Sequence, residues 1–377
     1  MDDIQVDGMD LIHAVDDKVK QVRTRSLDIS FNELLDMYNN GELIIDPDYQ
    51  RLFRWGKENQ SRLIESLIIE LPIPPIFVLE STEGVYELID GLQRVTSYLH
   101  FRGIETKAAI PEEDKGGFRL EGCDIVKELN GYNYDELPNS LKIKLKRNFI
   151  RVEVLRRESD ARLRYYMFKR LNTGGEALSY QEIRNCTMRL LSPDFNSFII
   201  EMSSNPDFRI CISNLSDEKL NAKGDQELVL RFFAFKNYKD QYRHDVNPFM
   251  DEYMEAVSDP NINVGFDYAA ERFIFEKTFK ILALTLGEYA FARTNANNNF
   301  VASLSPYQFE AFTLGIQDCL DKIDLDNPEI VDTLKSLFTE LKQDTEFKAL
   351  TTGGGKNTAK ELNKRISSVA DKVATVL

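Results

Sequence analysis

The segment from Tyr86 to Arg94 contains the residues best suited to binding a charged ligand. It reads YELIDGLQR, an apolar stretch followed by Asp90, Gly91, Gln93 and Arg94 where a second apolar pattern begins. Glycine permits a tight turn and close approach of a ligand to the backbone, and a helix N-terminus favours an anion. Arg94 adds a positive charge, Gln93 is suited to orienting water, and Asp90 could cap the helix or hold a metal ion or water. The segment predicts a phosphate-binding turn.

A second polar cluster, Tyr49-Gln50-Arg51, lies shortly before Trp55, the only tryptophan of the chain. Aromatic rings can stack on a nucleobase and glutamine can bond its edge, while arginine can bind a phosphate through two parallel hydrogen bonds. The same residues also fit a capped turn with Trp55 in the core. Taken alone, the cluster favours this second, structural interpretation.

A third cluster begins at Asn172 with the loop 172–175 (NTGG) and continues with the run 181–185 (QEIRN). The glycines would expose backbone donors to a ligand. Alternatively, ion pairs of Glu182 and Arg184 would make this a structural helix–loop–helix corner, and both interpretations remain open. The run 351–357 (TTGGGKN) lacks the glycine spacing and the final Ser or Thr of a phosphate-binding loop, so it predicts a linker.

Basic residues concentrate in the segment 141–170, although the net charge of the whole chain is −15. Phosphate contacts supply most non-specific affinity for nucleic acid, so the acidic whole argues against binding by overall charge. The candidate nucleic-acid-binding residues lie on one expected helix: Lys142, Lys144, Lys146 and Arg147. A solvated helix face is the alternative interpretation.

The scattered histidines and cysteines argue against several classes of protein. Three histidines and four cysteines form no HxxxH, HEXXH or CxxC arrangement, so we expect buried thiols, no protein metal site and no HNH nuclease centre. No stretch reaches the roughly 18 uncharged apolar residues of a membrane span. The acidic N-terminus does not fit a secretory signal. A cytoplasmic protein without membrane contact is expected.

Periodicity and capping residues predict the elements that must position these clusters. We expect helices over 31–39, 57–70, 138–147 and 159–171 and from residue 92 onward, and strands over 43–45, 76–79, 85–89 and 149–155. Beyond about residue 190 the strand signal disappears, and helices are expected over 227–236, 248–257, 268–289, 306–322 and 328–342. The predicted fold class is α+β, with a mobile arm (1–25), an α+β domain (26–190) and a helical domain (191–377).

Together the three clusters resemble the N-terminal domain of GmrSD-type modification-dependent restriction enzymes. That family carries a Tyr-Gln-Arg box, a DGQQR box and an LNTGG loop with a downstream QEIRN run. This chain has all three in order, with Leu92 in place of the first glutamine of DGQQR. If that glutamine carries the water, hydrolysis would be slow here, although its helical spacing beside Val95 favours a packing role. Similarity in the stretches 231–235 and 305–312 extends the resemblance over most of the chain.

The resemblance implies a ParB/sulfiredoxin-like fold that binds and hydrolyses a nucleoside triphosphate with Mg²⁺. Tyr49, Gln50 and Arg51 would line the nucleotide pocket, which Asn172 would complete. The residues Asp90, Gln93 and Arg94 of the second box would handle phosphates and water.

In this family the nucleotide controls DNA cleavage, often of phage DNA with modified bases. Because no HNH domain is visible, we expect an NTP-hydrolysing regulatory subunit that acts on DNA with a separately encoded nuclease, with homo-oligomerisation left open. One alternative is a nucleotide-sensing or scaffold protein that does not hydrolyse its ligand. Another is a ParB-like DNA nickase in which Asp90 assists a metal ion, but a single carboxylate gives two-metal chemistry little support.

Overall fold

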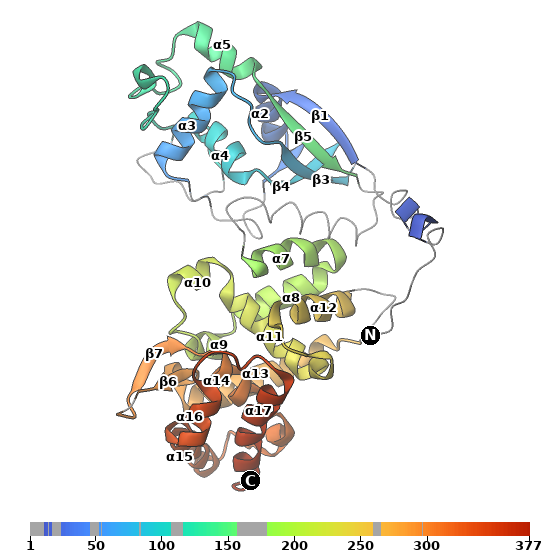
Figure 1. Ribbon diagram of the computed structural model, residues 1–377, viewed down its shortest axis with the longest axis vertical. Coiled ribbons are helices and arrows are strands. Elements are labelled where there is room, and N and C mark those ends of the chain that lie inside the picture. Colours follow the sequence, from blue (N-terminus) through green and yellow to red (C-terminus); the bar gives the residue numbers. More distant parts are fainter. Residues whose placement is uncertain are drawn as a thin grey trace. The chain divides into compact units, whose positions relative to one another are not determined.

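The computed structural model describes residues 11–13, 15–16, 24–45, 53, 55–82, 84–106, 116–156, 179–258, 265–295 and 297–377. They belong to two compact units, Met1–Leu178 and Ser179–Leu377, and each unit is described by itself (Figure 1). The first combines a sheet with helices and the second is mainly helical, which confirms the predicted α+β class. The expected helix over 159–171 lies outside the described residues.

A five-stranded mixed sheet forms the framework of the first unit, with strand order β1-β5-β3-β4-β2. Its strands are β1 (Thr24–Ser30), β2 (Leu43–Ile44), β3 (Ile76–Thr82), β4 (Val85–Asp90) and β5 (Phe149–Leu155). Strand β5 pairs antiparallel with β1 and parallel with β3, and β4 pairs antiparallel with β3 and parallel with β2. Four strands confirm the prediction, whereas β1 begins inside the segment expected to be a mobile arm.

In the described part of this unit, four α-helices pack with the sheet around a hydrophobic core. They are α2 (Phe31–Asn39), α3 (Lys57–Ile68), α4 (Leu92–Phe101) and α5 (Asn139–Arg147). The core joins Phe31 of α2, Ile64 of α3, Leu99 of α4 and Leu145 of α5 to the inner face of the strands. A capping contact starts α2 where the sequence predicted it, because the hydroxyl of Ser30 accepts a hydrogen bond from the backbone of Glu33 at 3.0 Å.

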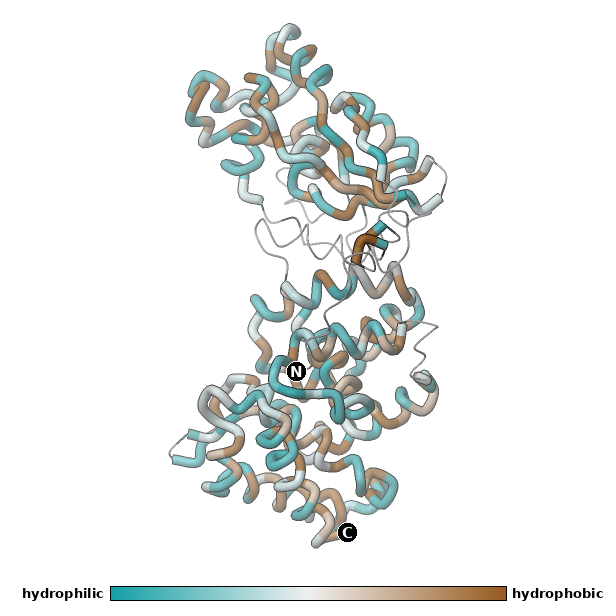
Figure 2. Tube along the Cα trace, turned by 45° about the vertical axis from the view of Figure 1, so that its right-hand side comes forward, coloured by the Kyte–Doolittle hydropathy of each residue, from teal (hydrophilic) through white to brown (hydrophobic). Residues whose placement is uncertain are grey.

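The described part of the second unit consists of helices and one small hairpin. Its α-helices are α7 (Tyr180–Leu191), α8 (Pro193–Ser203), α9 (Pro206–Cys211), α10 (Asp217–Asn221), α11 (Gly224–Tyr238), α12 (Val246–Ser258), α13 (Tyr268–Thr285), α14 (Pro306–Gly315), α15 (Pro328–Gln343), α16 (Thr345–Thr351) and α17 (Ala359–Ala374). Hydrophilic and hydrophobic stretches alternate along these helices in Figure 2, as expected of amphipathic helices. All five helices predicted beyond residue 190 are present.

The hairpin corrects the expectation that strands are absent beyond residue 190. Its strands β6 (Ala292–Thr294) and β7 (Phe300–Leu304) pair antiparallel with a register shift. Three and five residues are too few to produce a clear alternating pattern in the sequence. The loop predicted over 351–357 does lead into the last helix, α17, and the ammonium group of Lys356 donates to the carbonyls of Ala349 and Thr352 at the end of α16. Lys356 therefore terminates a helix.

Three further findings concern the described residues only. Cys123, Cys211 and Cys319 are buried free thiols, and burial raises the pKa of Cys123 to about 11. No described cluster of three or more His, Cys, Asp or Glu side chains could hold a metal ion. None of the described helices has the length and apolar character required to span a bilayer.

Candidate functional site

The turn from β4 to α4 has the strand–glycine–helix form that the sequence predicts. Asp90 ends β4, Gly91 is the N-cap residue and Leu92 begins α4. The backbone of Gly91 is left-handed, with φ of 106°, and a Cβ atom there would lie 2.4 Å from Cγ2 of Ile76. Glycine is therefore required by its conformation and by its contact with Ile76. The alternative in which Asp90 is the N-cap is wrong, because Asp90 is still paired in the sheet with Phe77.

Asp90 and Arg94 form an ion pair across this turn. Nη2 of Arg94 donates to Oδ2 of Asp90 at 2.9 Å and to the carbonyl oxygen of Pro75 at 3.0 Å. The Arg94 side chain is 16% exposed and that of Asp90 is 40% exposed. Nε of Arg94 is buried and has no hydrogen-bond partner among the described residues. The guanidinium group is thus held beside the turn, with part of its donor capacity unused.

The first turn of α4 offers backbone donors at the same place. The N-cap makes no side-chain capping hydrogen bond, and the first intrahelical bond of this turn runs from Val95 to Gly91 at 2.9 Å. The amide groups that precede Val95 therefore have no intrahelical acceptor. Leu92 packs against the hydrophobic core. This contact supports the packing role that its spacing predicted for the position where the family has a glutamine.

Gln93 connects the second sequence box to the first. Its Oε1 accepts a hydrogen bond from the backbone amide of Trp55 at 3.1 Å, and the carbonyl of Trp55 accepts one from Nε2 of Gln60 at 2.8 Å. Oε1 of Gln60 lies 2.9 Å from Nδ1 of His100. Gln60 and His100 are buried, so this chain of contacts follows α4 from its first turn to its last inside the fold. Trp55 itself is partly buried against the core, as the structural alternative predicted.

Sequence reasoning missed Gln60 and His100. Each is an isolated polar residue on a helix, and only the tertiary contact of α3 with α4 shows that they are partners. Four predicted pocket residues, Tyr49, Gln50, Arg51 and Asn172, lie outside the described residues. Their roles, and those of Asp90, Gln93 and Arg94 toward a nucleotide, stay predictions.

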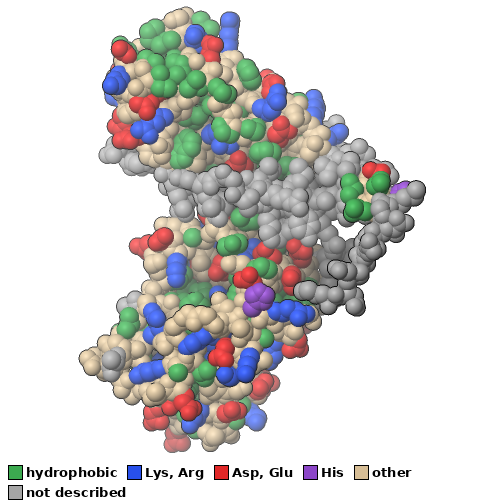
Figure 3. Space-filling view, in the orientation of Figure 1, with side chains coloured by type: hydrophobic (Ala, Val, Ile, Leu, Met, Phe, Trp, Pro, Cys, Tyr) green, Lys and Arg blue, Asp and Glu red, His purple; other side chains and the backbone are tan. Residues whose placement is uncertain are grey.

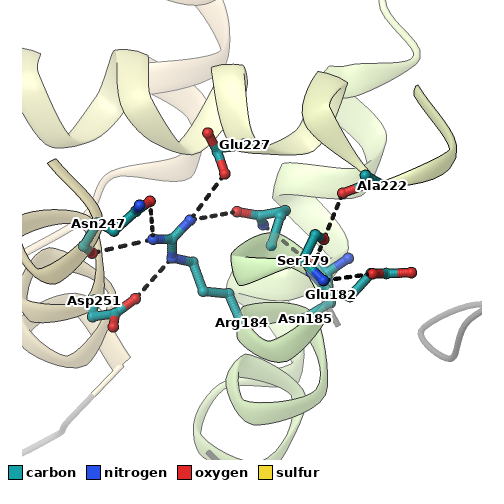
Figure 4. A network of polar contacts seen from close by, with 9 residues as sticks. Ser179, Glu182, Arg184, Asn185, Ala222, Glu227, Asn247 and Asp251 are labelled. Carbon is teal, nitrogen blue, oxygen red and sulfur yellow. Dashed lines mark hydrogen bonds and ion pairs between the residues drawn. The ribbon is translucent and has the colours of Figure 1, made fainter. Parts of the chain in front are cut away.

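The run 181–185 of the third box forms a buried network on α7 (Figure 4). Nε of Arg184 donates to Asp251 at 2.8 Å, Nη1 lies 3.4 Å from a carboxylate oxygen of Glu227, and Nη2 donates to the side chain of Asn247 at 3.0 Å. The Arg184 side chain is only 2% exposed. These contacts tie α7 to α11 and α12.

Glu182 has a different role from Arg184 within this box. It forms a capping box with Ser179: the hydroxyl of Ser179 accepts from the Glu182 amide at 3.1 Å, and the Glu182 carboxylate accepts from the Ser179 amide at 2.8 Å. Gln181 and Asn185 are joined by a hydrogen bond of 2.9 Å. These contacts support a structural role for the run 181–185, but the ion pairs join Arg184 to Asp251 and Glu227, which the sequence did not indicate. The loop 172–175 of the predicted helix–loop–helix corner lies outside the described residues.

Residues 31–189 match the family model described as GmrSD restriction endonuclease, N-terminal domain. This segment, less than half of the chain, is similar to the GmrSD N-terminal domain. The match confirms the resemblance carried by the three sequence boxes and indicates involvement in a phage-restriction system. A search of curated proteins found no match to the chain, and neither did a search of solved structures.

Outside the three boxes, the matched segment carries the basic helix α5. Lys144 and Arg147 are exposed, and Lys142 and Lys146 are half-buried. Part of this charge is compensated, since Nζ of Lys144 lies 3.3 Å from Glu70. On the face drawn in Figure 3, hydrophobic side chains gather over the first unit with lysine and arginine side chains near them. The four residues therefore do lie on one solvent-accessible helix, and their binding to nucleic acid stays a prediction.

Proposed function

We propose that this chain binds a nucleoside triphosphate at the Asp90–Arg94 turn and, through its hydrolysis, regulates a separately encoded nuclease in a phage-restriction system. One observation carries most of the proposal. At the start of α4, backbone amides without intrahelical acceptors lie beside an arginine that its neighbours hold in place. Backbone donors and a guanidinium group at a helix N-terminus suit a phosphate chain, and the GmrSD family match supports the same assignment.

Each residue of the turn has a specific role in this proposal. Arg94 binds phosphate oxygens through the donors that Asp90 and Pro75 leave unused. Asp90 orients Arg94. Because the Asp90 side chain is 40% exposed, its carboxylate can also coordinate the Mg²⁺ ion that accompanies the nucleotide. The described part of the turn offers this single carboxylate, so the phosphates supply most ligands of that ion. Gln93 is a positioning residue, because its side-chain Oε1 accepts a hydrogen bond from the backbone amide of Trp55.

Hydrolysis would transfer the terminal phosphoryl group to water and release a nucleoside diphosphate and inorganic phosphate. The alternative, a sensor that binds nucleotide without turnover, is favoured by two observations at this site. Leu92, which is partly buried, packs against the core where the family has a glutamine, and the side-chain Oε1 of Gln93 already accepts a hydrogen bond from the Trp55 amide. A turnover measurement therefore separates the two functions.

The fluorescence of Trp55 provides a direct probe of ligand binding at this turn, because the chain has no other tryptophan and the Trp55 amide is hydrogen-bonded to the Gln93 side chain. Each nucleoside triphosphate would be titrated with Mg²⁺ against Trp55 fluorescence, and phosphate release would be followed with and without DNA. We expect saturable binding that Arg94→Gln weakens at least tenfold and that the exposed control Arg62→Gln leaves unchanged. Binding without phosphate release would favour the sensor, and the absence of binding by all triphosphates would reject both functions.

We further propose that α5 contacts DNA on behalf of the complex. Its exposed residues Lys144 and Arg147 are three positions apart, so they lie on one face of the helix. Phe149, two residues beyond Arg147 at the start of β5, is 63% exposed. Cations next to an exposed ring suit a nucleic-acid strand, since phosphates attract the cations and bases can stack on the ring.

A further inference from the structure

A polar pocket of about 300 Å³ lies at the opposite end of α4 from the Gly91 turn. It is lined by Phe101, Arg102 and Gly103 at the end of α4, by parts of the segments 116–121 and 133–135, and by Lys57 at the start of α3. Helix α4 has ten residues, so its two ends lie about 15 Å apart. This pocket is therefore separate from the candidate triphosphate site.

Arg102 contributes to this pocket a cation that has no carboxylate partner among the described residues. Its Nη1 donates to the hydroxyl of Tyr98 at 2.7 Å, and its guanidinium lies 4.4 Å from the ring centroid of Tyr134. Burial raises the pKa of Tyr98 to about 12, so Tyr98 is a neutral partner at pH 7. Nε of Arg102 is buried and has no acceptor in the described part of the chain. Because the partners of this half-buried cation are a neutral hydroxyl group and aromatic rings, its charge is not neutralised by them and an anionic ligand would bind favourably.

The other walls of the pocket indicate what kind of anion fits. Lys57 supplies a second cation, and Arg119 is bound by both carboxylate oxygens of Glu136 at 2.6 and 2.7 Å. The half-buried ring of Tyr134 offers a stacking surface, and the acceptor Asp135 lies beside it. The combination suits a ligand with a phosphate for the cations, a planar ring for Tyr134, and a hydroxyl or amino donor for Asp135.

We propose that this pocket binds a nucleoside monophosphate group, either as a free nucleotide or as the terminal nucleotide of a nucleic-acid strand. Its volume is at the lower end of the range for small-ligand sites, which fits one nucleotide. The pocket also adjoins the basic helix: Nζ of Lys142 donates to the carbonyl of Asp135 at 2.7 Å and lies 5.6 Å from the ring centroid of Tyr134. A strand along α5 would therefore reach the pocket with its end.

The test uses the full chain with four probes: adenosine 5′-monophosphate, adenosine, and a short single-stranded oligonucleotide with and without a 5′-phosphate. Calorimetry would measure the affinity for each. We expect the phosphorylated probes to bind and Arg102→Met to weaken that binding about tenfold or more, because charged hydrogen bonds are lost. Lys57→Gln should weaken it in the same direction. The control Arg62→Met removes an exposed arginine whose carboxylate partners lie 3.8 and 4.0 Å away, and should change nothing.

Arg94→Gln separates this proposal from the triphosphate site, since monophosphate binding should survive in that variant. Tight binding of the monophosphate alone would assign the pocket to free nucleotide. Binding only of the 5′-phosphorylated strand, weakened by Lys142→Gln, would assign it to a strand end. The proposal is overturned if no probe binds saturably, or if folded Arg102→Met and Lys57→Gln proteins bind like the parent chain.

Discussion

The buried Arg184 network permits a quantitative test of what the QEIRN box does. Arg184→Met removes a guanidinium that is 2% exposed and deprives the carboxylate of Asp251, which is 11% exposed, of this partner at 2.8 Å. Breaking a buried ion pair from one side costs about 3–5 kcal/mol. For a unit of roughly 200 residues, each kcal/mol lowers the melting temperature by about 2–4 °C. We therefore expect the melting temperature to fall by about 6–20 °C.

The measurement is thermal unfolding followed by circular dichroism, arranged as a double-mutant cycle. Arg184→Met/Asp251→Leu should recover part of the loss, because both members of the ion pair are then apolar. Arg209→Met is the matched control in the same unit: its partner Asp225 lies 3.0 Å away, but its own side chain is 45% exposed. An exposed pair of this kind contributes at most about 1 kcal/mol.

Two results would refute this reasoning. In the first, the melting temperature of Arg184→Met stays within about 2 °C of the parent and nucleotide binding is also unchanged. In the second, the melting temperature is equally unchanged but nucleotide binding at the Asp90–Arg94 turn is lost. The second result would make Arg184 a functional residue, contrary to the structural role that its contacts indicate.

Three further predictions concern other parts of the chain. Gly91→Ala should destabilise the first unit by about 2–4 kcal/mol in urea unfolding, because the backbone there is left-handed and the new Cβ atom would contact Ile76 closely. Gly41 is the control: its φ is 74° but it has open space around it, so Gly41→Ala should lose only the free energy that comes from the left-handed backbone. Burial lowers the pKa of Lys342 well below 10.5, so between that lowered pKa and 10.5 the unfolded chain binds a proton that the folded chain lacks. The unfolding free energy should therefore rise with pH over that interval relative to Lys342→Met; equal slopes would contradict this. Lys144→Ala/Arg147→Ala should weaken DNA binding and flatten its salt dependence, and unchanged binding would return α5 to a solvated face.

Elements with local signals were predictable from the sequence. Helix α2 starts at Ser30 because that hydroxyl caps its own first turn, and such a contact spans only four residues. The strand–glycine–helix turn at Gly91 was equally visible, because a glycine between two apolar patterns is typical of a tight turn. The packing of Leu92 against the core was also predictable, because it follows from the helical spacing of apolar residues in the local sequence.

Elements that depend on distant partners were not predictable. Strand β1 is an edge strand that places little more than Leu27 and Ile29 against the core, so its pattern is too weak without its partner β5. Arg184 and Asp251 are 67 positions apart, and nothing in either local sequence identifies the other. In the same way, the contact between Gln60 and His100 exists only because α3 packs on α4.

The position of α7 shows why the family boundary and the structural boundary differ. The GmrSD match ends at residue 189, inside α7, and the sequence placed the division near 190. By packing, however, α7 belongs to the second unit, which begins at Ser179. The Arg184 guanidinium needs acceptors from α11 and α12, both beyond the matched region. A chain cut at residue 190 would keep all three family boxes but leave a buried cation without its carboxylates, and that cost is too large for α7 to remain folded as it is here.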